Sequence, residues 1–324
     1  MGDILSLAAD NLLSPIVLCF ALGVAASLAR SDLSVPEAAA KALSIYLLFA
    51  IGFKGGVSVS AHGVDMTLGL SLVAGVILSA LLPLIAFGLL RAMSGLDRLN
   101  AAAVAGHYGS ISIVTFVAAT SVLESSGIAS EGYMVAVAAA MEAPAILSAL
   151  WLISRGESGR MDANLWREIM LNGSIVLLVG AFFIGMITGE EGLAEISSFV
   201  VAPFKGVLCL FLLDMGLVAG RGLAKGGKLL GWGSIAFGIV MPPIGAAFGL
   251  LAALGLGLSL GGTVLLMTLS ASASYIAVPA AMRVALPEAN PSIYLTLSLG
   301  VTFPFNLVLG IPLYLAVASF VFGA

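Results

Sequence analysis

Charged residues are scarce in this chain of 324 residues, which has 13 Lys or Arg, 17 Asp or Glu, and a charged fraction of 9%. Because soluble domains carry about 25% charged residues, this composition argues against a water-soluble fold. The net charge of -4 is small and no basic stripe is present, so no nucleic-acid partner is expected. The two cysteines, Cys19 and Cys209, lie in apolar segments without metal-type spacing, so we expect two free thiols.

Motifs of the common enzyme and channel classes are also missing. The sequence has no HExxH, P-loop, dinucleotide fingerprint, haem motif or TVGYG filter. His107 and Ser110 are three residues apart on one helical face, but a Ser-His hydrolytic site would also need an orienting acid and a G-x-S-x-G elbow. We therefore predict that the chain is not an enzyme and uses no cofactor.

Hydrophobic residues, in contrast, make up 60% of the chain and form runs of roughly 20 residues. Each such run is long enough to cross about 30 Å of hydrocarbon. We predict an all-α membrane protein with ten transmembrane helices at about 12–29, 42–61, 66–90, 99–122, 132–153, 170–188, 196–219, 229–254, 261–282 and 291–320.

The sequence repeats itself after about 160 residues. Ser110 and Ser112 return as Ser270 and Ser272, and Pro144 returns as Pro304. The predicted domains are a first five-helix repeat at 1–154, a cytoplasmic linker at 155–168 and a second repeat at 169–324. An odd number of spans inverts the second copy in the membrane, and inverted repeats are typical of secondary transporters.

Basic residues sort to one side of this topology. That side receives 11 of them: Arg30, Lys41, Arg91, Arg98, Arg155, Arg160, Arg167, Arg221, Lys225, Lys228 and Arg283. The opposite loops hold acidic residues only. The positive-inside rule makes the basic side cytoplasmic, which places both termini outside a bacterial plasma membrane.

Two predicted spans are poor helices, because Gly and clustered Ser occur near their centres, at 105–112 and 268–275. We predict that helices four and nine are broken and cross near the midplane, since breaks at this depth are tolerated where they line a cavity. Half-helix N-termini bind a small anion without an Arg, and hydroxyls and freed carbonyls suit Na⁺. The alternative is that the small residues only let helices pack closely.

These breaks supply most of the candidate ligands. For substrate they are Gly109, Ser110, Ser112, Ala271 and Ser272; for sodium they are Ser110, Ser270, Ser272, Ser274, Glu142, Thr302 and Asn306. Glu142, Thr302 and Asn306 are polar residues inside spans, where they serve either as ion ligands or as structural hydrogen-bonding groups. Lys54 and Asp214 occupy matching spans and are candidate charge partners, for buried carboxylates or for each other.

The strings Tyr46-Leu47-Leu48-Phe49-Ala50-Ile51-Gly52-Phe53-Lys54-Gly55-Gly56 and Gly106-His107-Tyr108-Gly109-Ser110-Ile111-Ser112 resemble the SbtA family of sodium-dependent bicarbonate transporters. Ser31-Asp32-Leu33 and Leu213-Asp214-Met215-Gly216 do so as well, and the likeness covers all ten spans.

The resemblance implies a gate domain and a core domain built from both repeats, and Na⁺-coupled bicarbonate uptake by an elevator-like movement of the core. It also implies a homotrimer in the plasma membrane that is inhibited by a PII-like protein, SbtB, on the cytoplasmic face. The central linker is shorter than in cyanobacterial members.

Other functions stay open at this level. The same architecture suits a sodium-coupled carrier of another small organic anion. A cation/proton exchanger with Glu142 as proton carrier and an intramembrane enzyme are further alternatives. A dicarboxylate or phosphate carrier is disfavoured, because such anions favour bidentate Arg pairing and every Arg here lies in a predicted cytoplasmic loop.

Overall fold

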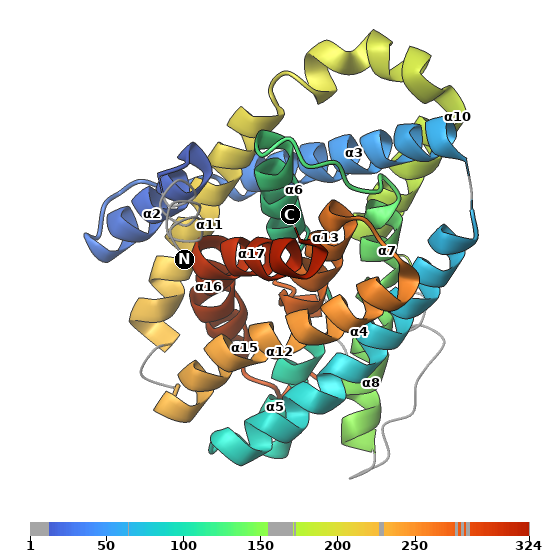
Figure 1. The fold of residues 1–324 in the computed structure, drawn as a ribbon. Coiled ribbons are helices and arrows are strands. Elements are labelled where there is room, and N and C mark those ends of the chain that lie inside the picture. Colours follow the sequence, from blue (N-terminus) through green and yellow to red (C-terminus); the bar gives the residue numbers. More distant parts are fainter. Residues whose placement is uncertain are drawn as a thin grey trace.

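The computed structural model describes residues 13–63, 65–154, 171, 173–226, 230–275, 278–279, 282 and 286–323. Every element in these ranges is a helix, and none of the described residues forms a strand (Figure 1). The prediction of an all-α protein is therefore confirmed. The predicted linker at 155–168 lies outside the described residues.

The elements in chain order are α2 (Pro15–Leu28), α3 (Glu37–His62), α4 (Met66–Met93), α5 (Arg98–His107), α6 (Ile113–Ser125), α7 (Met134–Ala140), α8 (Glu142–Ser154), α10 (Gly173–Val200), α11 (Phe204–Gly226), α12 (Trp232–Leu256), α13 (Leu260–Ala271), α15 (Pro291–Leu295), η1 (Thr296–Thr302), α16 (Phe303–Phe305), η2 (Asn306–Gly310) and α17 (Ile311–Phe322). The segments η1 and η2 are π-helical, and with α15, α16 and α17 they form one continuous helical stretch.

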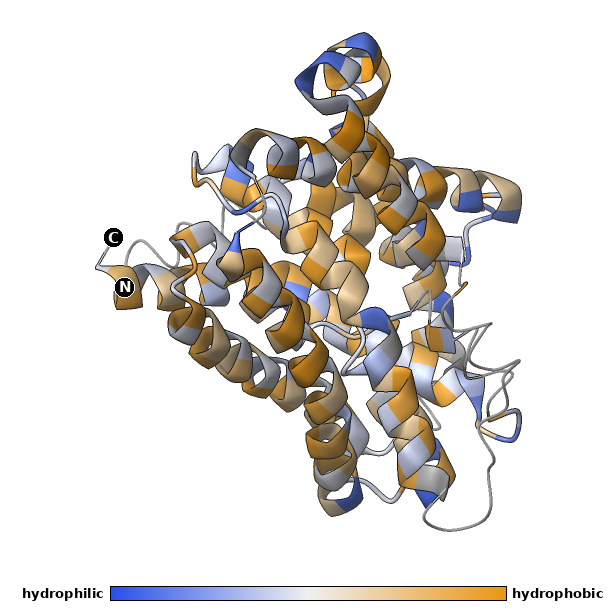
Figure 2. Cartoon of the chain, turned by 90° about the vertical axis from the view of Figure 1, so that its right-hand side faces the viewer, coloured by the Kyte–Doolittle hydropathy of each residue, from blue (hydrophilic) through white to orange (hydrophobic). Residues whose placement is uncertain are grey.

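Seven stretches in the described part of the chain are long and apolar enough to cross a membrane. The three shorter apolar helices are α2, α6 and α13, which fall in the first, fourth and ninth predicted spans. The long helices are hydrophobic along most of their length (Figure 2), and Ile187 and Leu251 are 80% and 67% exposed. Such a surface fits lipid rather than water.

Glycines pack four of these helices into two parallel pairs. In the α2–α11 pair, a Cβ at Gly23 would collide with the Leu213 carbonyl oxygen. In the α3–α10 pair, a Cβ at Gly185 would collide with the Phe53 carbonyl oxygen. Close backbone approach through small residues is the usual packing of membrane helices.

The structure corrects the boundary between the sixth and seventh predicted spans. The sixth was expected to end at 188 and the seventh to start at 196. Instead, α10 bends at Gly189, which has a φ of 61°, and continues to Val200 before α11 begins at Phe204. The part of α10 after the bend forms the arch at the top of Figure 1. Glycine allows this bend because it tolerates positive φ, whereas hydropathy alone read the acidic segment as a loop.

Residues of the predicted loops make contacts at two places in the structure. At one, Arg98 donates to the Leu152 carbonyl oxygen over 2.8 Å, which joins the start of α5 to the last turn of α8. At the other, a cavity is lined by Asp65, Glu131 and Ser259, from the loops before α4, α7 and α13. These contacts place one basic loop residue beside α8 and two acidic residues around one cavity, and the sidedness of the loops stays a prediction.

Candidate functional site

Two interrupted helices meet inside the helical bundle. One interruption separates α5 from α6, and the other follows the end of α13 at Ala271. The Ser112 backbone N–H donates to the Ser272 hydroxyl over 2.9 Å, and the Ser274 N–H donates to the His107 carbonyl oxygen over 2.8 Å. The two segments that were predicted to be broken are thus broken and in direct contact, and we call this contact region the crossover (residues 107–112 and 271–275).

Serine side chains form the ends of the half-helices at the crossover. Ser112 caps α6, because its hydroxyl accepts from the Thr115 backbone N–H over 3.2 Å. Ser272 follows the last turn of α13, and its hydroxyl donates to the Leu269 carbonyl oxygen over 2.9 Å. Serine competes with helical hydrogen bonding in this way, so the sequence itself specifies where each helix stops.

The outer ends of these half-helices are also capped. The Asp97 carboxylate accepts from the Asn100 backbone N–H over 2.8 Å at the start of α5, and this bond holds the pKa of that carboxyl below its usual value. At the start of α13, the Ser259 hydroxyl accepts from the Gly262 N–H and donates to the Glu131 carboxylate. Both half-helices therefore have defined positions at both ends.

Glycines hold the crossover against the helices behind it. A Cβ at Gly109 would lie 2.5 Å from the Ser79 carbonyl oxygen of α4 and would collide with the Pro83 ring. A Cβ at Gly245 of α12 would collide with the Ser270 carbonyl oxygen. Gly109 was predicted as a substrate-binding residue, and in the structure its visible role is this close approach.

Ser110 and Ser270 are the unusual members of the predicted set. They are 1% and 2% exposed, and neither hydroxyl has a hydrogen-bond partner among the described residues. Buried polar groups are normally paired, so an unpaired one needs an explanation. The two residues occupy equivalent positions of the repeat. Ser110 lies within the first interruption, and Ser270 lies in the last turn of α13, next to the second.

Thr302 and Asn306 both make structural hydrogen bonds. The Thr302 hydroxyl donates to the Gly238 carbonyl oxygen over 2.7 Å and lies 2.6 Å from the Tyr108 hydroxyl oxygen. The Asn306 side chain donates to the Ala271 carbonyl oxygen and accepts from the Tyr314 hydroxyl. Of the two roles considered for these residues, this arrangement favours the structural one.

Glu142 begins α8 and is 5% exposed, and its Oε2 atom has no hydrogen-bond partner in the described part of the chain. It sits at a break in the helical ladder, because the Ser79 hydroxyl donates to the Met141 carbonyl oxygen and accepts from the Ala145 N–H. Since Ser79 also contacts Gly109, the turn that carries Glu142 is connected to the crossover through α4.

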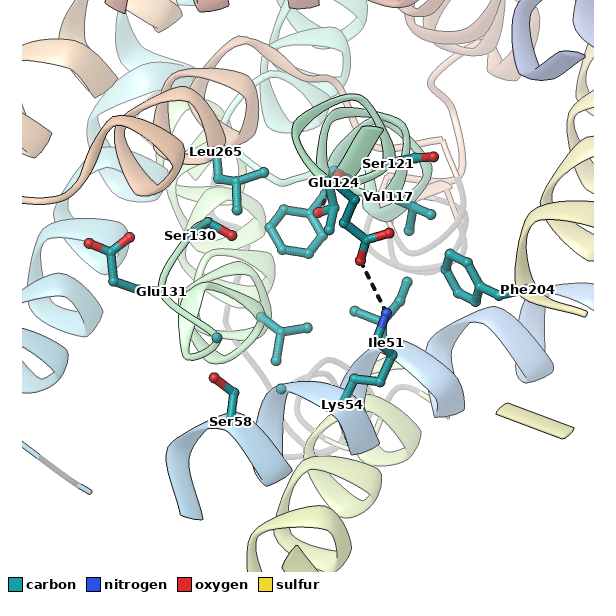
Figure 3. A pocket seen from close by; sticks show the side chains of 15 residues that line it. Ile51, Lys54, Ser58, Val117, Ser121, Glu124, Ser130, Glu131, Phe204 and Leu265 are labelled. Atoms are coloured by element: carbon teal, nitrogen blue, oxygen red, sulfur yellow. Dashed lines mark hydrogen bonds and ion pairs between the residues drawn. The ribbon is translucent and has the colours of Figure 1, made fainter. Parts of the chain in front are cut away.

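Lys54 pairs with Glu124 rather than with Asp214. The Lys54 Nζ atom lies 3.2 Å from the Glu124 Oε1 atom, and both side chains line a cavity of about 190 Å³ (Figure 3). Asp214 lies on α11 and is 5% exposed. The partner of Lys54 is thus the exposed carboxylate of Glu124, and neither pairing considered from the sequence, with a buried carboxylate or with Asp214, is the one observed.

Several residues of the crossover escaped sequence reasoning. Tyr108, Ser79 and Tyr314 support it through the hydrogen bonds described above, and the Tyr294 ring stacks on the His107 ring with centroids 4.5 Å apart. Only the position of Tyr108 beside the glycine-serine string offered a signal. The other three come from helices distant in the sequence, so no spacing pattern links them to the site.

The architecture is that of a multi-pass helical membrane protein, and its site is built from two interrupted helices, which is typical of secondary transporters. Over residues 15–319 the chain matches the Na⁺-dependent bicarbonate transporter superfamily, and it belongs to that family. This membership confirms the resemblance seen in the strings around Lys54 and His107. A search of curated proteins found no significant match.

Proposed function

We propose that the protein is a sodium-coupled bicarbonate symporter that binds its substrates at the crossover. The observation that carries this proposal is the pair of buried, unpaired hydroxyls of Ser110 and Ser270. In a family of Na⁺-dependent bicarbonate transporters, the ligands that complete these groups are an oxyanion and Na⁺. A hydroxyl serves either, since it donates to an anion and offers its oxygen to a cation.

The anion is assigned to the start of α6. The first N–H groups of a helix lack intrahelical partners and carry partial positive charge, so they stabilise a small anion. Ser110 lies two residues before the N-cap Ser112 of this helix and adds a donor, which suits an anion as small as bicarbonate. Binding Na⁺ nearby, through Ser270, Ser272 and Ser274 or Glu142, offsets the negative charge in a low-dielectric site.

The same proposal includes ten spans in two inverted repeats. The parallel pairs α2–α11 and α3–α10 support it, because an inverted repeat exchanges the first span with the sixth and the second with the seventh. The contact of Gly23 with Leu213 corresponds to the contact of Gly185 with Phe53. Gly23 and Gly185, and likewise Phe53 and Leu213, are offset by about 160 residues. We assign these four helices to a gate domain and the others to a core domain that moves like an elevator.

Assembly and regulation are proposed from the family resemblance, and the orientation is proposed from the positive-inside rule. We place the protein in the bacterial plasma membrane with both termini outside, as a homotrimer. A PII-like protein of the SbtB type is the proposed cytoplasmic regulator. Such a partner would lie next to the linker at 155–168, which is outside the described residues.

The deciding experiment measures uptake of ¹⁴C-labelled inorganic carbon at alkaline pH into proteoliposomes. An inward Na⁺ gradient should drive accumulation, and a K⁺ gradient of the same size should not. Excess unlabelled acetate or lactate should leave uptake unchanged; strong competition would instead favour a carrier of another small organic anion. Sealed vesicles with folded protein that take up no bicarbonate would contradict the proposal.

A further inference from the structure

The cavity around Lys54 joins the two proposed domains and has an unusual chemical lining. Its walls come from α3, α6, α7 and α11, together with Leu265 of α13. It contains Lys54, four hydroxyl residues and two carboxylates, with apolar side chains between them. In Figure 3, Lys54 and Glu124 reach toward each other from α3 and α6. A lysine ammonium group near several hydroxyls offers the positive charge and the hydrogen-bond donors that an oxyanion needs.

The position of this cavity along α6 connects it to the crossover. It is lined by Glu124 at the outer end of α6 and by Phe116 near the start. The Phe116 N–H donates to the Ser112 carbonyl oxygen, so the cavity reaches within one helical turn, about 5.4 Å, of the α6 N-terminus. The Lys54 and Glu124 side chains are 34% and 47% exposed, so they are accessible from outside the protein.

Lys54 keeps donor capacity in this cavity beyond its bond to Glu124, because the two acidic residues are placed differently. The Glu131 carboxylate accepts from both the backbone N–H and the hydroxyl of Ser259, at 2.7 and 2.9 Å. Glu124 instead faces Lys54, whose Nζ also lies 5.5 Å from the Phe204 ring centroid. An ammonium group has three donors, so one bond to Glu124 leaves others for an anion.

A second cavity, of about 300 Å³, stands in the repeat-related position. It is lined by Val218, Pro291, Ser292 and Leu295, which are 160 residues after four residues that line the first cavity: Ser58, Glu131, Gly132 and Val135. This second cavity contains one cation among its described lining residues, Arg221. Two cavities related by the repeat, each with one basic residue, fit the two sides of a pathway with alternating access.

We propose that Lys54 is an anion-capturing residue in the outer access route to the crossover, and that Glu124 competes with the incoming oxyanion for it. This inference rests on the proposed bicarbonate transport. A water occupies about 30 Å³ of liquid, so a cavity of about 190 Å³ holds an anion of four heavy atoms, such as bicarbonate, with part of its hydration. Exchange of one carboxylate for another oxyanion keeps Lys54 paired at each step, which avoids leaving its charge unpaired in apolar surroundings.

The test compares external bicarbonate kinetics of Lys54→Gln, Lys54→Arg and Glu124→Gln in proteoliposomes with one defined orientation. Lys54→Gln should raise KM about fivefold to tenfold, since a charged hydrogen bond is lost. Lys54→Arg should keep KM near wild type, and Glu124→Gln should lower KM because the competing carboxylate is gone. In the Lys54→Gln background, Glu124→Gln should have no further effect.

The opposite effects of Lys54→Gln and Glu124→Gln on KM distinguish anion capture from a purely structural ion pair. If Lys54→Gln and Glu124→Gln both lower the maximal rate and leave KM unchanged, the pair is a contact between domains and the inference is overturned. Unchanged kinetics in both variants also overturn it. Wild-type uptake in the same vesicles reports the proposed function independently, so failure of either proposal is recognisable.

Discussion

The backbone N–H of Ser112 and the hydroxyl of Ser272, which are 160 residues apart in the sequence, are joined by a hydrogen bond of 2.9 Å. The two residues are also equivalent positions of the internal repeat. The bond therefore ties the two interrupted helices together at their breaks. Mutation of Ser272 is therefore expected to affect stability, whereas mutation of Ser110 or Ser270, whose hydroxyls have no partner among the described residues, is expected to affect transport.

Ser110→Ala and Ser270→Ala should abolish or strongly reduce uptake without loss of stability. Neither hydroxyl has a partner in the described structure, so its removal breaks no internal hydrogen bond. Uptake and the thermal unfolding midpoint should be measured on the same preparations. Thr268→Ala is the matched control, because this buried hydroxyl donates to Val264 within α13; its uptake should persist. Full uptake in both serine variants would move the site elsewhere.

Ser272→Ala should destabilise the protein. It removes the acceptor of the Ser112 N–H and leaves a buried donor unpaired, at a cost of about 1–3 kcal/mol. Thermal unfolding in detergent should show a lower midpoint for Ser272→Ala than for Ser110→Ala. Equal midpoints would mean that this bond contributes little to holding the breaks together.

Gly109→Ala should impair both folding and transport. The added Cβ collides with the Pro83 ring and displaces the crossover from α4, with an expected overpacking cost of about 1–3 kcal/mol. Gly88→Ala, on α4 itself, is the control, since a Cβ there meets no heavy atom within 4 Å. Midpoints of thermal unfolding should fall for Gly109→Ala and stay constant or rise for Gly88→Ala.

Glu142→Gln should change the sodium dependence of uptake if the carboxylate helps to bind the coupling ion. Its Oε2 atom is buried without a partner among the described residues, so the charge has no other visible compensation. Initial rates measured against Na⁺ concentration at fixed bicarbonate should show a raised half-saturating Na⁺ concentration. An unaltered Na⁺ response would assign Glu142 a structural role beside Ser79.

Cysteine labelling tests the proposed orientation. In a background with Cys19 and Cys209 replaced by Ser, Ser125→Cys at the end of α6 should react with a membrane-impermeant maleimide in intact cells. Gly95→Cys, in the loop after α4, should react only after permeabilisation. Both positions are exposed, so the comparison reports sidedness rather than burial. Reversed labelling would invert the topology.

The sequence by itself determined the membrane class, the family and the places where helices are interrupted. These features depend on composition and local chemistry: apolar runs of fixed length, and Ser and Gly at positions 105–112 and 268–275 that disfavour continuous helix. The same local reasoning failed at Gly189, because whether a polar segment after a glycine is loop or helix depends on what it packs against.

Tertiary structure alone decided which candidate groups are already bonded. In the sequence, six intramembrane polar residues were equivalent candidates: Ser110, Ser112, Ser270, Ser272, Thr302 and Asn306. Among them, only Ser110 and Ser270 have hydroxyls without a hydrogen-bond partner in the described structure. It also paired Lys54 with Glu124, which lies 70 residues away and was read as a loop residue. Hydrogen bonds and ion pairs between distant helices depend on how the helices pack, which no periodicity in one segment encodes.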